Sequence, residues 1–266
     1  MHWWKHGCIG DTFVTGECNA GHESAGEVIE IGEGVTEWKV GDRVAIEVGV
    51  PCMKPSCDEC RTGRYNGCPD LVFFSTPPYH GTLTRWHVHP AKWLHRLPDN
   101  VSFAEGALCE PLVVALGGID RSNLRVGDPL VICGAGPIGL VTLLAARAAG
   151  AEPIVITDLL QSRLDVAKTL VPGVRTVLID RSHKPRDIGE TIKAAAGCPI
   201  KICLECTGVE SSIQSGTYAL AFGGTVFVIG VGKFEQTASF SSWTIALSNS
   251  LFCQSVPSYA PAPYGN

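Results

Sequence analysis

Four cysteines lie within one short stretch of the chain, at positions 52, 57, 60 and 68. Gaps of four, two and seven residues separate Cys52, Cys57, Cys60 and Cys68, and several prolines and glycines lie among them. A loop of this composition has little apolar core, and four thiolates around a tetrahedral zinc ion would hold it together. The spacing therefore predicts a structural zinc with no open position for chemistry. One or two buried free thiols are the alternative interpretation.

A histidine and an acid are adjacent at His22 and Glu23, between Gly21 and Gly26. On a regular strand these two side chains would point to opposite faces, but a glycine-flanked strand entry lets the backbone turn so that both reach one point. Imidazole and carboxylate together suit zinc. A His-Glu dipeptide by itself is more often a surface feature, so the pair is a candidate metal site only within a wider pattern.

A glycine-rich motif runs from Gly134 to Gly139. It follows the apolar run 130–132 and precedes an apolar helical run at 140–149, and Asp158 stands nineteen residues after its last glycine. In this context the glycines allow a tight turn and bring a pyrophosphate close to a helix N-terminus. Asp158 can then accept hydrogen bonds from the adenosine ribose and repel a 2′-phosphate, so the motif predicts NAD rather than NADP. A glycine-rich turn that binds nothing is the alternative.

The elements that must position these residues change character along the chain. Glycine and proline punctuate the first part, which predicts short, mostly antiparallel strands. Ser102 and Glu105 form a capping-box pattern, which predicts the start of a helix that continues through 113–121. Strands and crossover helices alternate in the second part, which predicts five parallel strands and an α/β fold. The strands expected in the two parts are 27–31, 38–47, 72–74, 83–89 and 93–97, and then 130–132, 153–158, 176–180, 202–207 and 225–230.

The composition bounds the class of protein. A chain of 266 residues that is 45% hydrophobic and 18% charged predicts about two globular domains. A net charge of -5 argues against a nucleic acid or an anionic membrane as partner. The first residues lack the features of a secretory signal, and no stretch has eighteen consecutive apolar residues, so a cytoplasmic location is expected. Twelve cysteines in such a protein are expected as metal ligands or core residues rather than disulfides.

Seven motifs resemble, in order, those of zinc-containing medium-chain dehydrogenases of the polyol branch, and most of all the fungal L-arabinitol 4-dehydrogenases. The motifs occupy 21–26, 40–44, 63–66, 75–78, 110–112, 134–139 and 205–210. The resemblance implies a GroES-like β catalytic domain over 1–115, a doubly wound Rossmann domain that binds NAD over 116–236, and an atypical uncharged tail over 237–266. It also implies an active site in the cleft between the domains and a homo-oligomer, a tetramer.

The resemblance further implies the roles of individual residues. His22 and Glu23 match the family's catalytic zinc ligands, and Glu110 matches the acid that reaches the metal directly or through its water. His2 matches a histidine that ends a proton relay, and Trp3 falls on an aromatic position of the substrate pocket. The expected cofactor contacts are Gly134, Gly136, Pro137, Ile138, Gly139, Asp158, Arg163, Ile229, Gly230 and Val231.

The implied reaction is NAD-dependent oxidation of a polyol of the L-arabinitol, xylitol or sorbitol class to a ketose, with zinc lowering the pKa of the substrate hydroxyl. Two departures from the family are visible. The family's first zinc ligand is a cysteine five residues before the histidine that matches His2, and the given sequence starts one residue before that histidine, so the catalytic site is expected to lack its first cysteine ligand. In addition, no charged residue follows Glu235. They predict an incomplete catalytic domain, a Rossmann sheet that ends after its fifth strand, and weak catalysis. Two other functions stay open: a zinc-stapled nucleotide-binding protein without catalysis, and a zinc-free, NADPH-dependent quinone reductase, which Asp158 and the four cysteines disfavour.

Overall fold

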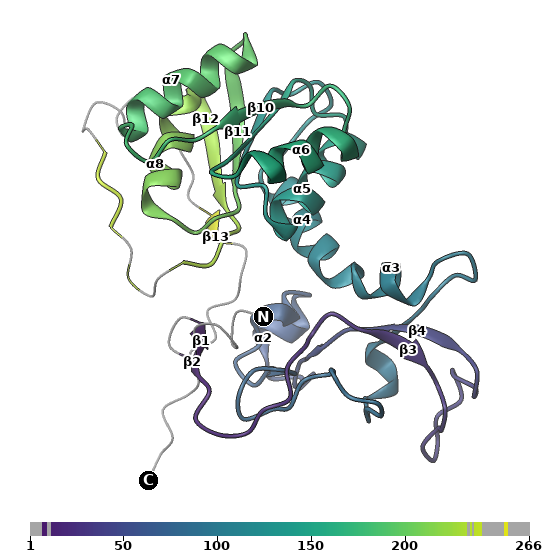
Figure 1. The fold of residues 1–266 in the computed structure, drawn as a ribbon. Helices are drawn as coiled ribbons and strands as arrows, with labels where there is room; N and C mark the ends of the chain where they lie inside the picture. The colour runs from purple at the N-terminus through teal and green to yellow at the C-terminus, as the bar shows by residue number, and fades with distance from the viewer. Residues whose placement is uncertain (1–6, 10–11, 233–234, 236, 241–252, 255–266) are drawn as a thin grey trace. The chain divides into compact units, whose positions relative to one another are not determined.

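The structure, a computed structural model, divides the chain into two compact units. One unit forms within residues 1–111 and the other within residues 112–256, so that helix α4 (Cys109–Arg121) spans the boundary. The structure describes all residues except 1–6, 10–11, 233–234, 236, 241–252 and 255–266 (Figure 1). Among the described residues, no helix has both the length and the apolar character that crossing a membrane would need.

A six-stranded parallel sheet forms the centre of the second unit. Its order is β10-β9-β8-β11-β12-β13, so the direction of winding reverses between β8 and β11. In a doubly wound sheet of this order, a dinucleotide binds across the carboxyl ends of the strands at that point of reversal. The strands are β8 (Leu130–Cys133), β9 (Ile154–Asp158), β10 (Arg175–Leu178), β11 (Ile200–Glu205), β12 (Leu220–Val228) and β13 (Cys253–Gln254).

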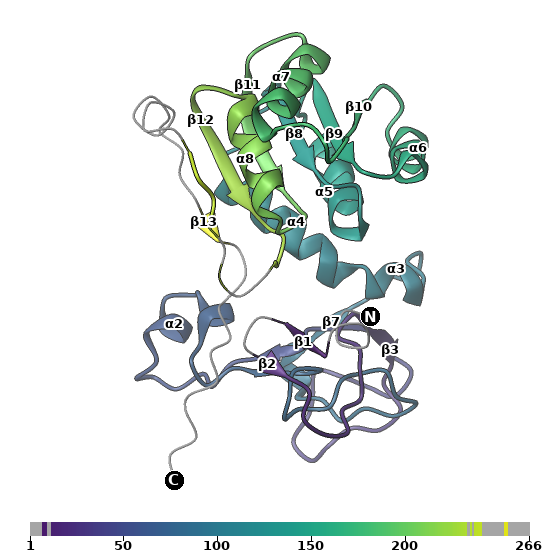
Figure 2. The ribbon, with the colours of Figure 1, turned by 60° about the vertical axis from the view of Figure 1, so that its left-hand side comes forward.

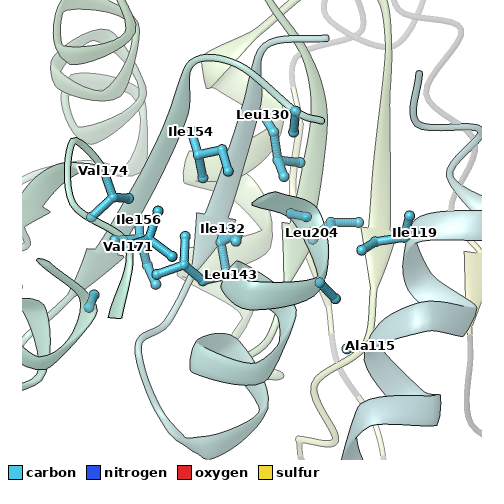
Figure 3. Close-up of a cluster of buried hydrophobic side chains, with 14 of the residues drawn as sticks. Ala115, Ile119, Leu130, Ile132, Leu143, Ile154, Ile156, Val171, Val174 and Leu204 are labelled. Carbon is cyan, nitrogen blue, oxygen red and sulfur yellow. The ribbon is translucent and has the colours of Figure 1, made fainter. Parts of the chain in front are cut away.

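Helices cover both faces of this sheet because alternate side chains of its strands are apolar on both sides. On one face, Leu130, Ile132 and Ile156 pack with residues of α4, α5 (Pro137–Ala148) and α6 (Gln161–Leu170) (Figure 3). On the other face, Val131 and Val155 pack with residues of α7 (Pro185–Ala196) and α8 (Glu210–Ala219). Helices α7 and α8 lie side by side there (Figure 2). The sheet is therefore buried on both sides, as expected for parallel strands.

The alternation predicted from the sequence is confirmed, with one addition. All five expected strands are present, but the expectation that the sheet ends after the fifth strand is wrong. Strand β13 pairs with β12 through Phe227↔Cys253 and Val228↔Gln254. The expectation rested on the missing charges of the tail, whereas strand pairing uses backbone groups that every non-proline residue carries.

Short antiparallel sheets make up the first unit. The largest has three strands in the order β3-β4-β7. Strands β5 and β6 form a separate two-stranded sheet, and so do β1 and β2. A short helix α3 (Phe103–Ala107) begins at the predicted capping box, which is present: Ser102 accepts from the Glu105 amide and the Glu105 carboxylate accepts from the Ser102 amide. The remaining elements are β1 (Cys8–Ile9), β2 (Thr12–Phe13), β3 (Ala25–Glu27), β4 (Arg43–Ile46), β5 (Gly49–Val50), β6 (Val72–Phe73), β7 (Leu94–Arg96), α2 (Asp58–Arg61), η1 (Tyr65–Gly67) and η2 (Ala91–Trp93).

Two strand predictions in this unit are wrong. The strand expected at 27–31 ends at Glu27, because its partner β4 begins at Arg43, which pairs with Glu27. The stretch 83–89 forms no strand, and its Val88 is 94% exposed. Val28 still exchanges backbone hydrogen bonds with Gly41 and Asp42, at 2.8 and 2.9 Å, but no described strand continues beside 29–31, and none pairs with 83–89. Alternation alone therefore overestimated the extent of the sheet.

Candidate functional site

The four cysteines of the predicted structural zinc site come together in the first unit. Their sulfur atoms all lie within 4.8 Å of one another. The Sγ atoms of Cys52 and Cys60 are 3.9 Å apart, as are those of Cys57 and Cys68. Zinc–sulfur bonds of about 2.3 Å in a tetrahedron place the sulfur atoms about 3.8 Å apart, whereas a disulfide needs about 2.05 Å. The observed spacing therefore fits four ligands of one zinc ion and no disulfide among them.

Local backbone structure presents these thiols to one point. Cys57 caps the N-terminus of α2, Cys60 lies in that helix, and Cys68 follows η1. The Cys52 amide donates to Cys68 Sγ at 3.4 Å. Burial, together with hydrogen bonds to the neighbouring thiols, raises the pKa of Cys60 to about 12. The Cys60 thiol thus resists ionisation by itself, and a divalent cation bound beside it would favour its thiolate form.

A second cluster contains His22, Glu23 and Glu110, whose candidate ligand atoms also lie within 4.8 Å of one another. His22 and Glu23 precede β3, and Glu110 lies in the first turn of α4. The sequence interpretation treats Glu110 as a ligand that acts directly or through water. Its carboxylate is brought into the same group as the other two side chains. The three residues match the number of protein ligands that a catalytic zinc uses, with a fourth position open.

The loop that carries His22 and Glu23 is fixed by backbone hydrogen bonds. Gly21 adopts φ +93°, a conformation that side chains disfavour, and this turns the chain as expected for a glycine-flanked strand entry. The Thr82 amide donates to the Gly21 carbonyl at 2.8 Å, and the Thr82 hydroxyl donates to the same oxygen at 3.0 Å. Sequence reasoning missed Thr82, because it lies in a stretch interpreted only as turn and strand.

The charges in this cluster call for a cation. Burial, followed by the nearby Glu23 carboxylate, raises the pKa of Glu110 to about 7. Burial lowers the pKa of His22, so its imidazole is neutral and keeps a free nitrogen lone pair near neutral pH. Two carboxylates beside a neutral imidazole form a donor set suited to zinc. The residues present therefore fit a catalytic zinc ion.

The glycine-rich motif forms the turn between β8 and α5 in the second unit. Gly136 caps the N-terminus of α5, whose first residues are Pro137 and Ile138. A side chain at Gly139 would overlap the carbonyl oxygen of Gly134, so the close approach of helix and strand requires glycine there. The free amides at the start of α5 are a site for a pyrophosphate.

Asp158 ends β9 beside this turn. Its carboxylate is buried, 8% of the residue being exposed, and accepts from the Ala135 amide at 2.8 Å and the Leu160 amide at 2.9 Å. The Arg163 guanidinium lies 3.5 Å from the same carboxylate. A carboxylate at the end of the second strand is where a ribose is held in dinucleotide-binding sheets. Asp158 thus lies beside the turn that would hold the pyrophosphate.

The remaining predicted site residues either follow β12 or lie outside the described residues. Ile229 and Gly230 lie at the carboxyl end of β12, where their amides donate to the Glu205 carbonyl at 2.7 and 2.9 Å. Val231 follows them and is 47% exposed. His2 and Trp3 lie outside the described residues.

Comparisons with known proteins agree with this architecture. Residues 2–99 match the family "Alcohol dehydrogenase GroES-like domain", and residues 137–257 match the family "Zinc-binding dehydrogenase". A solved oxidoreductase/dehydrogenase of unknown specificity from Escherichia coli superposes with a TM-score of 0.80 at 32% identity, over 91% of this chain and 67% of that one. The predicted fold class, a GroES-like domain plus a Rossmann-like parallel sheet, is confirmed.

Curated relatives are more similar still in sequence. The L-arabinitol 4-dehydrogenase of Aspergillus niger is 50% identical over 259 residues, which cover 93% of this chain and 66% of the relative. Bovine sorbitol dehydrogenase is 44% identical over 238 residues, which cover 90% of this chain and 65% of the relative. The chain thus spans somewhat less than two thirds of the length of these relatives. With its two matched families and its solved relative, the chain belongs to the zinc-containing medium-chain alcohol dehydrogenases.

Proposed function

We propose that this protein is an NAD-dependent polyol dehydrogenase of the L-arabinitol and sorbitol type, which oxidises one secondary hydroxyl of its substrate to a ketone. The observation that carries the proposal is the cluster of His22, Glu23 and Glu110, in a chain about half identical to L-arabinitol 4-dehydrogenases. A quinone reductase that works without zinc would have no use for this cluster or for the four cysteines.

In this proposal His22, Glu23 and Glu110 hold the catalytic zinc. When bound, zinc lowers the pKa of the substrate hydroxyl, and NAD accepts the hydride from the carbon that bears it. The neutral ring of His22 lies 5.5 Å, between ring centroids, from Phe73, which limits its rotation. The bonds from Thr82 to Gly21 keep the loop in place. With zinc bound, the carboxylates of Glu23 and Glu110 would offset its positive charge.

The second unit would bind the cofactor. Amides at the start of α5 would face the pyrophosphate, and Asp158 would accept from the ribose hydroxyls. Cys52, Cys57, Cys60 and Cys68 would hold a second zinc ion that stabilises their loop and takes no part in the reaction.

The direct test is to mix the zinc-loaded chain with NAD and L-arabinitol, xylitol or D-sorbitol and to follow the absorbance of reduced nicotinamide. We expect polyol-dependent reduction of NAD, with a rate that differs among the three polyols. A chain that binds NAD but oxidises none of them would contradict the proposal and favour the nucleotide-binding protein without catalysis.

Cofactor preference gives a separate prediction. Changing Asp158 to serine should narrow the difference in binding free energy between NAD and NADP by about 1 to 3 kcal/mol, because the variant loses a charged hydrogen bond to the ribose and the repulsion of a 2′-phosphate. Titrations of both cofactors measure the difference. Asp165→Ser, an exposed acid on α6, is the matched control and should leave the preference unchanged. Equal affinity of the unmutated chain for the two cofactors would contradict the assignment.

A further inference from the structure

A charged residue lies in the middle of the parallel sheet. Glu205 is the last residue of β11 and is 0% exposed. No Lys, Arg or His of the described chain lies within ion-pair distance of its carboxylate. A buried carboxylate without a cation is costly unless hydrogen bonds satisfy it. Hydrogen bonds must therefore stabilise this carboxylate, because burial of apolar surface does not.

Four donors from the segment after β11 satisfy this carboxylate. The Thr207 amide donates to it at 2.9 Å, the Gly208 amide at 2.9 Å and the Ser212 hydroxyl at 2.8 Å. The Thr207 hydroxyl also donates to it and in turn accepts from the Val209 amide at 3.1 Å. All four groups donate, so they suit the ionised form of Glu205, which only accepts. The carboxylate thereby fixes the path of the chain between β11 and α8.

The segment that Glu205 holds is Cys206–Gly208, called here the β11 loop. It packs closely against the glycine-rich turn on one side and against the residues after β12 on the other. A Cβ atom at Gly134 would lie 2.7 Å from Thr207 Cγ2, and one at Gly208 would lie 2.5 Å from the Gly232 nitrogen. The backbone carbonyl of Glu205 also accepts from Ile229 and Gly230. The glycine-rich turn, the β11 loop and the end of β12 therefore meet around one anchoring residue.

These segments lie at the carboxyl ends of β8, β11 and β12, where the strand order reverses. Asp158 ends β9, on the opposite side of β8 from β11. A dinucleotide whose adenosine ribose is held at Asp158 extends across this point of reversal toward β11 and β12. The β11 loop is then next to the nicotinamide half of the cofactor and not the adenosine half.

We propose that Glu205 is a positioning residue, which holds the β11 loop in the conformation that receives the nicotinamide half of NAD. The inference rests on the proposed function, because it takes NAD as the ligand of the second unit. It adds a role for a residue that is neither a predicted metal ligand nor a predicted cofactor contact.

The test compares Glu205→Gln with the unmutated, zinc-loaded chain. The glutamine keeps the shape of the side chain but replaces one accepting oxygen by a donating NH2 group, which opposes the donors that face it. We expect NADH, titrated by its fluorescence, to bind about tenfold or more weakly. AMP, which reports the adenosine half only, should bind within about twofold of the unmutated chain, since Asp158 is untouched. Hydrogen exchange should be faster at the amides of Thr207, Gly208 and Val209.

Four further outcomes decide between this role and others. Unchanged NADH binding and unchanged exchange in Glu205→Gln would overturn the inference. So would an equal loss of NADH and AMP binding, because that would indicate general loosening of the unit. If Glu205→Gln does not fold, Ser212→Ala removes one of the four donors and should give a smaller change in the same direction. If the unmutated chain binds no NADH, the proposed function fails, while the exchange data still test whether Glu205 holds the loop.

Discussion

Changing Cys60 to serine is expected to remove one zinc ion per chain. Its sulfur lies 3.9 Å from that of Cys52. The metal-binding group found here among the described residues consists of the four cysteines alone, so the loss of Cys60 leaves three ligands for the zinc ion. A serine hydroxyl is a poor substitute for a thiolate, because it does not ionise near neutral pH and is a harder ligand. The expected zinc content of the purified variant, measured by elemental analysis, is one ion below that of the unmutated protein.

The loss should also destabilise the loop around the site. Structural zinc sites contribute apparent free energies of about 10 to 16 kcal/mol in zinc-finger peptides, and much of that is folding free energy. Helix α2 has four residues and buries none of them, so this segment has little apolar core of its own. We expect faster proteolysis within residues 52–68 and little change in the second unit. Cys198→Ser, outside the cluster, is the matched control, and full zinc content in Cys60→Ser would refute the assignment.

Changing His22 to alanine is expected to abolish polyol oxidation while NAD binding persists. The variant leaves two carboxylates, Glu23 and Glu110, without the nitrogen ligand, and three protein ligands are what a catalytic zinc requires. We expect the polyol-dependent rate to fall by at least about a hundredfold and the zinc content to fall by one ion per chain. The cofactor should still bind, because its predicted contacts all lie in the second unit.

Two comparisons make this prediction specific. His183→Ala, an exposed histidine of the second unit, should retain both activity and zinc. Adding zinc to His22→Ala should not restore the rate, whereas it should restore a chelator-treated sample of the unmutated protein. If His22→Ala oxidises polyols at the unmutated rate, the cluster of His22, Glu23 and Glu110 is not the catalytic metal site.

The sequence determined the second unit almost completely. Its apolar strands and helices alternate, so five parallel strands, their crossover helices and the glycine-rich turn followed from general rules of parallel sheets, whereas the strand order and the sixth strand β13 came only from the structure. The four cysteines indicated the structural zinc site equally well, because all four candidate ligands lie within seventeen residues of one another and no distant residue is needed. Both predictions depend on short-range information.

Tertiary structure decided what depends on residues far apart in the chain. No local pattern indicates that Thr82 would fix the loop at Gly21. Glu110 was expected near His22 and Glu23 only through the family resemblance, and the structure supplies the proximity of the three side chains. The stretch 83–89 alternates like a strand, yet a strand needs a neighbouring edge that a sequence does not display. Glu205 is the clearest case. The sequence places it within the expected strand 202–207, and its donors from Thr207, Gly208 and Ser212 are local. Only the packing of β11 between β8 and β12 buries this residue.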